Sequence, residues 1–301
     1  MNPATLSLRQ LRYFEAAARL GHFGRAAEEC AVTQPALSMQ IRELEAALGA
    51  ALFERRPGET VLTPLGREIA EGASKILLAA NDLAALAKHR GKVLSGPLSL
   101  GIIPTLAPYI LPQLLKYLSK QYPALKLELR EAQTKAMLAE LSRGELDLVM
   151  AAIPNDNFDL EESHLFDDRF LFAAGADNAK RARIDPETLD PAKLILLEEG
   201  HCLRDQALSF CAPERGVTKT GLGATSLSTV MQMVANGYGA TFIPEIAVEA
   251  ETRGRKLSLQ RFTAPEPSRK IGLVWRKTSP RKRDFEAFGK AVKEALKPRR
   301  K

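Results

Sequence analysis

A long helical pattern in the first third of the chain constrains the fold most, because it separates two regions with different patterns. Residues 63–90 open with Thr63-Pro64, a helix start, and place leucine or isoleucine at heptad-like positions. Polar and helix-breaking residues follow, with Ser95-Gly96-Pro97 as the boundary. A chain of 301 residues is also too long for one ordinary hydrophobic core. The sequence therefore predicts a first domain, a linker helix with a hinge, and a last domain, over residues 1–65, 66–95 and 96–301.

The first region carries a helix-turn-helix pattern. Apolar residues at helical spacing predict an amphipathic helix over residues 7–20, and residues 24–30 support a short second helix. After a turn, Thr33 can cap a third helix. The apolar stripe of this third helix is formed by Leu37, Ile41, Leu44 and Leu48. Residues 52–62 then have the pattern of two short strands around a Pro-Gly turn, which predicts a basic wing.

The polar face of the third helix is suited to reading DNA. Gln34, Ser38 and Arg42 stand at successive i+4 positions opposite the apolar stripe, so one face packs while the other is free to reach base edges. Thr33 is placed to contact a phosphate, and Arg55 on the wing is placed to meet an adjacent minor groove or its backbone. The alternative interpretation is a small helical bundle with a solvated polar face.

Short runs within the first 65 residues decide between these interpretations. They are FEAAAR at 14–19, RAAE at 25–28, TQPALS at 33–38, IRELE at 41–45, LG at 48–49 and LFER at 52–55. Together they resemble the winged helix-turn-helix of the LysR-type transcription regulators. The resemblance implies a transcription factor that acts with RNA polymerase on a pseudo-palindromic double-stranded DNA site. The residues implied in DNA binding are Thr33, Gln34, Pro35, Ser38, Arg42 and Arg55.

The same resemblance implies an organisation for the rest of the chain. The linker helix is expected to dimerise two DNA-binding heads, and family members of this kind are usually tetramers. The part beyond the linker is expected to be a periplasmic-binding-protein-like sensor of two α/β subdomains.

The region beyond Pro97 has an α/β pattern of its own. Residues 98–103 form the first strand candidate, and residues 111–122 form a helical stretch after it. Further strand candidates are residues 126–130, 146–152, 170–174, 194–197, 241–243 and 271–275. Short apolar strands that alternate with helices predict a layered α/β architecture.

Two of the three cysteines, Cys202 and Cys211, are spaced as a potential switch. If residues 203–211 are helical, a rise of about 1.5 Å per residue holds the sulfurs roughly 13 Å apart, whereas a disulfide needs Cα atoms within about 7 Å. A bond between them would therefore force the segment to unfold. The neighbouring His201 and Arg204, together with a helix start, predict a lowered pKa for the Cys202 thiol. The alternative is a pair of small buried apolar residues in a reducing cell.

A second resemblance bears on these cysteines. The runs GHCLRDQA at 200–207 and FC at 210–211, together with GIIPT at 101–105, are similar to the redox segment and first sensor strand of peroxide-sensing LysR-type regulators. This similarity implies that hydrogen peroxide oxidises Cys202 and that Cys211 resolves the product to a reversible disulfide. A thiol reductant such as glutaredoxin or thioredoxin would then reset the switch.

The resemblance also assigns residues around the thiol. Thr105, Thr134 and His201 are expected to line the peroxide pocket. Asp205 is expected to support proton movement or the later rearrangement, and Arg276 is expected to help stabilise the thiolate.

Composition excludes several other classes of protein. A net charge of +7 agrees with a polyanionic partner but does not prove one. The chain has no apolar run long enough for a membrane span, and its start lacks an export signal, so we expect a cytoplasmic protein with no membrane partner. Three cysteines without a CxxC pattern, and histidines without ligand spacing, predict neither a disulfide framework nor a metal or cofactor site. Cys30 is expected to be a buried packing residue.

Two rival functions share parts of this pattern. A LysR-type regulator can instead sense a small organic effector in the cleft between its subdomains, with both cysteines merely structural. A thiol peroxidase that turns over with a reductant would use the same cysteine chemistry, but it would have no use for a DNA-binding head. We therefore expect a regulator and not an enzyme.

Overall fold

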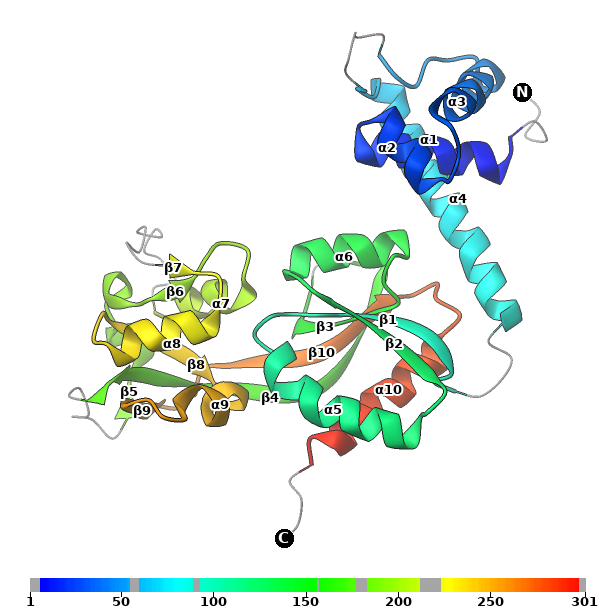
Figure 1. Cartoon of the computed structure of the whole chain (residues 1–301). Coiled ribbons are helices and arrows are strands. Elements are labelled where there is room, and N and C mark those ends of the chain that lie inside the picture. Colours follow the sequence, from blue (N-terminus) through cyan, green and yellow to red (C-terminus); the bar gives the residue numbers. More distant parts are fainter. Residues whose placement is uncertain are drawn as a thin grey trace. The chain divides into compact units, whose positions relative to one another are not determined.

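The chain folds into two compact units, which span residues 1–90 and residues 91–301 (Figure 1). The computed structural model describes residues 6–54, 60–88, 93–155, 157–176, 183–211 and 223–297. Arg55, which the sequence placed on the DNA-binding wing, lies outside these residues.

The first unit is helical. Its described helices are α1 (Leu8–Leu20), α2 (Phe23–Glu29), α3 (Gln34–Leu48) and α4 (Pro64–Lys88). Ser7 and Gln10 form a capping box at the start of α1, and Gly21 ends that helix in a left-handed conformation with φ 62°. Thr33 is the N-cap residue of α3, but its side chain makes no capping hydrogen bond. The helix-turn-helix prediction is confirmed.

A small hydrophobic core holds this unit together. The stripe of α3 contributes Leu37, Ile41 and Leu44, which are buried against Phe14 of α1. Cys30 is buried in the same core, as the sequence predicts for a packing residue. Burial of these side chains fixes α3 with its opposite, polar face outward.

The two arms of the predicted wing pair with each other. Phe53 and Leu62 form an antiparallel bridge. The Glu54 N–H donates to the Val61 carbonyl at 2.8 Å, and the Thr63 N–H donates to the Leu52 carbonyl at 2.9 Å. These bonds join the end of the wing to the start of α4.

The second unit is built on β-sheet. Among the described residues, eight strands form one sheet: β1 (Gly96–Ile102), β2 (Leu125–Glu131), β3 (Leu148–Ile153), β4 (Leu160–Gly175), β5 (Arg183–Ile184), β8 (Ala240–Pro244), β9 (Leu257–Phe262) and β10 (Ser268–Arg276). A separate pair is formed by β6 (Leu196–Leu197) and β7 (Gly223–Ala224). The main path runs β2-β1-β3-β10-β4-β9-β5, and β8 pairs with β4.

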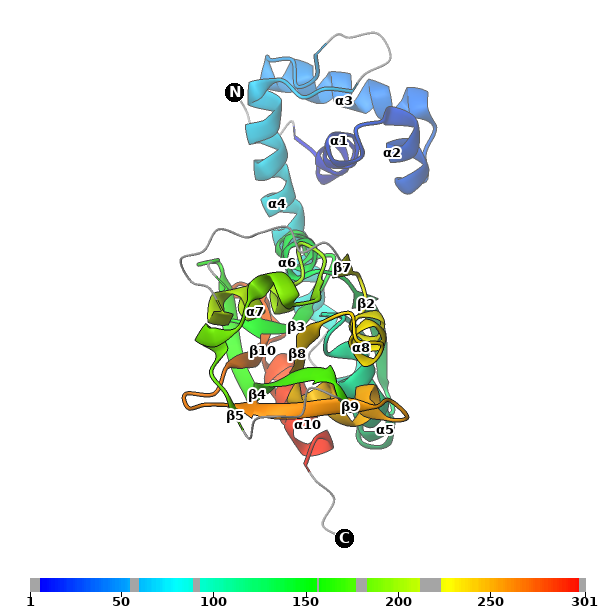
Figure 2. The same cartoon turned by 90° about the vertical axis from the view of Figure 1, so that its left-hand side faces the viewer.

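Helices cover these strands. They are α5 (Ala107–Gln121), α6 (Thr134–Arg143), α7 (Cys202–Cys211), α8 (Leu227–Ala235), α9 (Val248–Thr252) and α10 (Lys282–Ala295), with the short 3-10 turns η3 (Pro186–Thr188), η4 (Pro191–Lys193) and η5 (Glu245–Ala247). In Figure 1, α5 and α10 lie on one side of β1, β3 and β10, and α6 lies on the other. Figures 1 and 2 both show α7 and α8 on one side of β4 and β9.

The long strand β4 belongs to two subdomains. Its residues 160–169 pair with β10, while residues 170–175 pair with β8 and β9. The first subdomain contains β1, β2, β3, α5, α6 and α10, and the second contains β5 to β9 with α7, α8 and α9. The predicted sensor of two α/β subdomains is confirmed.

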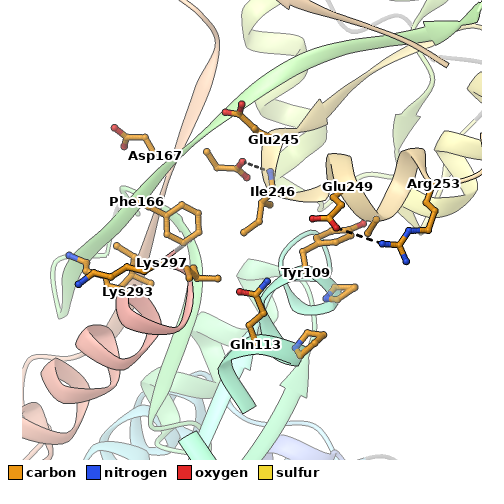
Figure 3. Close-up of a pocket in the computed structure, with 16 residues that line it drawn as sticks. Tyr109, Gln113, Phe166, Asp167, Glu245, Ile246, Glu249, Arg253, Lys293 and Lys297 are labelled. Carbon is orange, nitrogen blue, oxygen red and sulfur yellow. Dashed lines mark hydrogen bonds and ion pairs between the residues drawn. The ribbon is translucent and has the colours of Figure 1, made fainter. Parts of the chain in front are cut away.

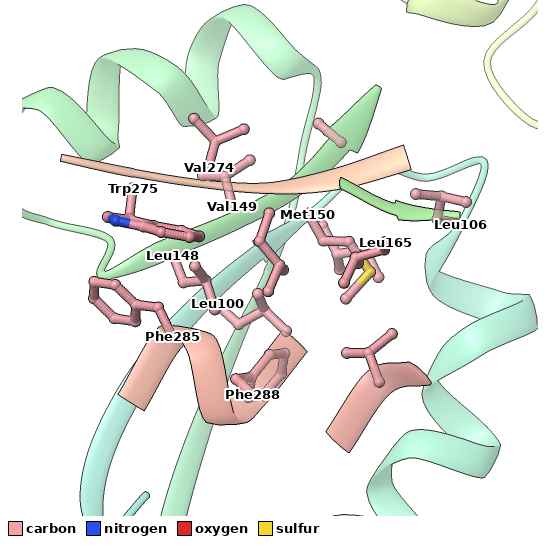
Figure 4. Packing of buried hydrophobic residues seen from close by; sticks show 14 of the residues in the cluster. Leu100, Leu106, Leu148, Val149, Met150, Leu165, Val274, Trp275, Phe285 and Phe288 are labelled. Atoms are coloured by element: carbon pink, nitrogen blue, oxygen red, sulfur yellow. The ribbon is translucent and has the colours of Figure 1, made fainter. Parts of the chain in front are cut away.

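Each subdomain has its own hydrophobic core. Figure 4 shows the first, where Trp275 of β10 contacts Phe285 of α10 with ring centroids 5.6 Å apart, and Phe288 of α10 lies below the strand residues Leu100 and Met150. In the second core, Phe242 stacks on Phe262 with ring centroids 4.7 Å apart, and Phe170 meets Phe242 edge-on. These separate cores allow the junction between them to hold polar groups.

The substitution Phe288→Ala tests the first core. Because Phe288 is fully buried, its loss is expected to lower the free energy of unfolding by about 3–5 kcal/mol. Phe158→Ala is the matched control, since that side chain is 88% exposed and its loss should cost less than about 0.5 kcal/mol. Denaturant unfolding of the full chain measures both, and equal losses would contradict this description of the core.

Candidate functional site

Cys202 and Cys211 occupy the two ends of α7, a helix of 10 residues. Cys202 is partly buried against the core of the first subdomain, whereas Cys211 is buried in the core of the second. The rise of an α-helix separates their Cα atoms by about 13 Å, beyond the limit of about 7 Å for a disulfide. Both are free thiols. The condition considered for residues 203–211 therefore holds, since α7 is present and keeps the two thiols apart.

The loop before α7 joins the two subdomains. Gly200 adopts φ +89°, a left-handed conformation, and brings the chain close to Gln133, the residue before α6. The Gln133 side-chain amide donates to the Glu199 carbonyl at 3.2 Å. A Cβ atom at Gly200 would lie 2.3 Å from Gln133 Oε1. Cys202 lies beside Thr134, the first residue of α6, and the preceding His201 is buried.

Thr134, the first residue of α6, acts on the Cys202 sulfur. A side-chain hydrogen bond from Thr134 favours the thiolate and so lowers the pKa of the thiol. The Thr134 hydroxyl oxygen is buried and has no hydrogen-bond partner of standard geometry among the described residues. It is therefore a polar group with spare hydrogen-bonding capacity beside the sulfur.

A buried ion pair between Arg269 and Asp168 brings a positive charge near the Cys202 thiol. Arg269 of β10 and Asp168 of β4 are directly opposite in the antiparallel register, with Arg269 Nη2 2.9 Å from Asp168 Oδ2. Arg269 Nη1 donates to Thr105 Oγ1 at 2.8 Å, and Nη2 donates to the Thr105 carbonyl at 3.2 Å. The Asp168 Oδ1 atom accepts the backbone N–H of Ile246 at 3.1 Å. The pair thus ties strands of the junction to Thr105 on one side and to η5 on the other.

Burial dominates the acidity of the Cys202 thiol. Removal from water raises its pKa above the ordinary value, while the positive charge of Arg269 and the Thr134 hydroxyl act in the opposite direction. The charge of Asp205 raises the pKa further, and the Leu203 N–H lowers it. The predicted lowering is therefore wrong in its net direction, because the sequence does not show how deeply the sulfur is packed.

The basic residues expected to act on the thiol have other partners. Arg204 is buried and donates to the Leu197 carbonyl at 3.2 Å. Arg276 donates to the carbonyls of Leu141 and Leu146, at 3.1 and 3.4 Å. The guanidinium whose charge favours the Cys202 thiolate is that of Arg269. The role that the resemblance implies for Arg276 stays a prediction.

Arg269 and Asp168 were missed in the sequence because the available signal is weak. Both lie just outside the apolar runs 271–275 and 170–174 that predict strands. Their pairing depends on a strand register between residues that are 101 positions apart. Opposite charges placed one or two positions before two apolar runs are the only local hint.

The polar face of α3 is presented as the sequence predicts. Thr33, Gln34, Pro35 and Arg42 are exposed and Ser38 is half-buried. The opposite face is anchored by Leu37, Ile41 and Leu44 in the core of the first unit. Such an arrangement leaves several donors and one fixed positive charge free to meet a polyanion.

The described part of the chain shows neither metal ligands nor a membrane span. Within it, His, Cys, Asp and Glu do not gather in groups of three that could hold a metal ion. Among the same residues, every helix is too short or too polar to cross a bilayer.

Comparison with protein families accounts for both units. The helix-turn-helix model described as "Bacterial regulatory helix-turn-helix protein, lysR family" matches residues 8–67, and the "LysR substrate binding domain" matches residues 91–297. The chain belongs to the LysR family. This LysR-family membership establishes a bacterial transcription regulator with a DNA-binding head and a separate regulatory domain.

Individual relatives narrow the comparison within the LysR family. A protein of Escherichia coli O6:H1 named "Hydrogen peroxide-inducible genes activator" is 39% identical over 97% of this chain and 96% of its own length. A full-length OxyR variant from Pseudomonas aeruginosa, with a cysteine replaced by aspartate, superimposes with a TM-score of 0.77 at 36% identity over 95% of this chain and 94% of that one. A Corynebacterium glutamicum OxyR variant with H2O2 bound gives a TM-score of 0.62 at 37% identity over 96% and 94%.

The substitution Thr134→Val tests the contact between α6 and the thiol of this LysR-family chain. Valine keeps the shape but removes the hydroxyl that favours the thiolate, so the pKa of Cys202 should rise and its alkylation by iodoacetamide at neutral pH should slow by roughly two- to tenfold. Mass spectrometry of the Cys202 peptide across a pH series measures the rate. Thr252→Val, whose hydroxyl donates to the Val248 carbonyl, is the control and should leave the pH profile unchanged. An unaltered profile in Thr134→Val would remove Thr134 from the site.

Proposed function

We propose that this chain is a DNA-binding transcription regulator that senses hydrogen peroxide through a reversible Cys202–Cys211 disulfide and activates oxidative-stress defence genes. The observation that carries the proposal is the placement of two free thiols at opposite ends of α7, each against a different subdomain core. Relatives named for peroxide-inducible gene activation, and a relative captured with H2O2 bound, support the choice of oxidant.

The chemistry begins at Cys202. Its thiolate attacks one oxygen of hydrogen peroxide, the O–O bond breaks, and the sulfur becomes a sulfenic acid while the other oxygen leaves as hydroxide and takes up a proton to give water. The Cys211 thiol then attacks the oxidised sulfur, so the S–S bond forms and a second water is released. A dithiol reductant such as glutaredoxin or thioredoxin returns both cysteines to thiols by exchange.

Thr105, Thr134 and His201 line the peroxide pocket in this proposal. The buried Thr134 hydroxyl has spare capacity for an incoming oxygen, and Thr105 Oγ1, which already accepts from Arg269, can still donate its own hydrogen. We assign thiolate stabilisation to Arg269, and the contribution implied for Arg276 by the resemblance is kept as part of the proposal. Asp205 is exposed on the outer side of α7, where it can pass protons to water or assist the later rearrangement.

Disulfide formation must rebuild the junction of the subdomains. Bringing the two Cα atoms from about 13 Å to within about 7 Å requires turns of α7 to unwind. Cys202 then leaves the first core and Cys211 is drawn from the second. A single covalent event thereby changes the surface that the sensor offers to other copies of the chain.

Assembly and DNA binding follow from the family. We infer three functional segments, a DNA-binding head of residues 1–65, a dimerising linker with hinge of residues 66–95 and a sensor of residues 96–301, which assemble into a tetramer as a dimer of dimers. The heads bind a pseudo-palindromic duplex through Gln34, Ser38, Arg42 and their neighbours, and oxidation shifts their spacing and recruits RNA polymerase. The protein acts in the cytoplasm, where its DNA target and thiol reductants are present.

A second candidate is a regulator that binds a small organic effector, and a groove between the subdomains favours it. Figure 3 shows this groove, which has a cavity volume of about 1030 Å³ and is lined by α5, β4, η5, α9 and the end of α10. Its lining includes Tyr109, Gln113 and Phe166, with the Glu249–Arg253 ion pair at the rim. An effector of this kind would activate the protein without peroxide. Activation in the absence of peroxide therefore distinguishes effector binding from peroxide sensing.

A thiol peroxidase is the enzymatic alternative, and we propose that the chain is not an enzyme. A sensor needs one oxidation per response, whereas a peroxidase would consume peroxide continuously with a reductant at a rate independent of DNA.

The substitution Cys202→Ser tests the proposed function directly. Peroxide treatment of the native chain should yield one internal Cys202–Cys211 disulfide and a changed footprint on promoter DNA, and the serine variant should show neither because the nucleophile is missing. Mass spectrometry of the treated protein and footprinting in both redox states measure these outcomes. Cys30→Ser is the control and should respond as the native chain does. A peroxide response that survives in Cys202→Ser would refute the assignment.

The substitution Arg42→Ala tests the DNA-reading face. Loss of a base-edge or phosphate contact should weaken binding to the specific site by roughly 1–3 kcal/mol. Titration of labelled promoter DNA at several salt concentrations measures the affinity and its salt slope. Lys116→Ala, which removes the same charge from an exposed position of α5, should leave the affinity unchanged. Equal effects of the two substitutions would mean that only net charge matters.

A further inference from the structure

The Arg269–Asp168 ion pair lies on the two strands that run between the subdomains. Both side chains are almost fully buried, and Arg269 Nε and Nη2 both contact Asp168 Oδ2, at 3.0 and 2.9 Å. Burial of two charges is costly unless each is held by well-oriented partners. Packing alone therefore does not account for this buried pair, and a functional role is expected.

The partners of the pair fix the direction of the guanidinium. Of its five N–H groups, those on Nε and Nη2 reach the Asp168 carboxylate, and those on Nη1 and Nη2 reach the Thr105 hydroxyl and carbonyl. The second Asp168 oxygen accepts the Ile246 N–H from η5. The centroid of the Phe170 ring lies 5.9 Å from the guanidinium carbon of Arg269, so the ring covers one face of the guanidinium.

The charges that face the thiol come from several elements. Arg269 from β10 and the Thr134 hydroxyl from α6 favour the Cys202 thiolate, as does the Leu203 N–H at the start of α7. Asp205 on α7 disfavours it, and His201 immediately precedes the thiol.

Asp168 has its own set of neighbouring charges. It faces Arg269 directly, and Glu245 of η5 acts on it at longer range. In a site of low dielectric constant, a carboxylate in contact with a guanidinium cancels much of the field that the guanidinium exerts elsewhere.

We propose that Asp168 is a positioning residue that holds the Arg269 guanidinium on Thr105 and restrains the positive charge available to the Cys202 sulfur. The inference rests on the proposed function, because it names the group that sets how much peroxide the sensor needs. With the carboxylate in place, the resting thiol is held back from indiscriminate oxidation. Without it, the same guanidinium would favour the thiolate more strongly.

A purely structural role for Asp168 makes a different prediction. Removal of either partner from a buried ion pair destabilises a protein in any case, so loss of stability does not distinguish the two roles. A change in the pH dependence of Cys202 reactivity does, because packing alone does not alter the charge that the sulfur experiences.

The experiment compares iodoacetamide alkylation of Cys202 across a pH series in the full chain. Asp168→Asn keeps the shape and one carbonyl acceptor but removes the charge, so the midpoint should move to lower pH and alkylation at neutral pH should become about tenfold faster. Asp167→Asn is the matched control, since Asp167 is the adjacent acid on β4, has an exposed side chain and pairs with His164. It should leave the midpoint where it is in the native chain.

A second pair of variants keeps the test decisive if Asp168→Asn folds poorly. Arg269→Gln removes the positive charge and should raise the midpoint above that of the native chain. The double substitution Asp168→Asn with Arg269→Gln should keep this raised midpoint, because Asp168 acts on the sulfur through the Arg269 charge. The proposal is refuted if Asp168→Asn matches Asp167→Asn or shifts upward, or if the double variant has a midpoint below that of the native chain.

The alkylation assay separates this inference from the proposed function. It measures the reactivity of the Cys202 thiol with iodoacetamide instead of peroxide, and it requires neither Cys211 nor DNA. If the alkylation midpoint of Asp168→Asn does not shift, the proposal for Asp168 fails and the proposed peroxide sensing is unaffected. If Cys202→Ser still responds to peroxide, the proposed function fails and the effect of Asp168 on the Cys202 thiol is unaffected.

Discussion

The hydrogen-bonded backbone of α7 is the constraint on which the functional site depends. As long as this helix is intact, the thiols at its two ends cannot meet, and each remains packed against a different core. Covalent bonding of the sulfurs and the folded state of α7 therefore exclude each other. This mutual exclusion would convert a bond between the two sulfurs into a change at the junction of the two subdomains, which share β4.

The surroundings of Cys202 balance reactivity against restraint. Burial and Asp205 hold the thiol in its neutral form, while Arg269, Thr134 and the first turn of α7 favour the thiolate. The approach of Gln133 to Gly200 and Glu199 is a contact between the subdomains, and it lies beside Thr134 and the first turn of α7. The acidity of the thiol and the closure of the junction are therefore linked properties.

Local patterns in the sequence predicted much of this architecture. The stripe of α3 and its exposed polar face both follow from spacing within one element. The two-subdomain organisation and the pocket residues came from resemblance to a family. The acidity of Cys202 and the part played by Arg269 could not be read from the sequence, because they depend on burial by α6 and on a strand pairing across about a hundred residues. The role of Arg276 came from the same resemblance, and its guanidinium donates to the backbone carbonyls of Leu141 and Leu146.

The third cysteine has a practical consequence. Cys30 is enclosed in the helical core of the first unit, where burial raises the pKa of its thiol, and Cys211 is enclosed in the second sensor core, where burial raises the pKa to about 12. Of the three cysteines, Cys202 is consequently the one that is not fully buried. A fluorophore or spin label attached at neutral pH would report from the sensor junction alone, which offers a direct optical route to follow the regulator while its DNA-binding head remains chemically untouched.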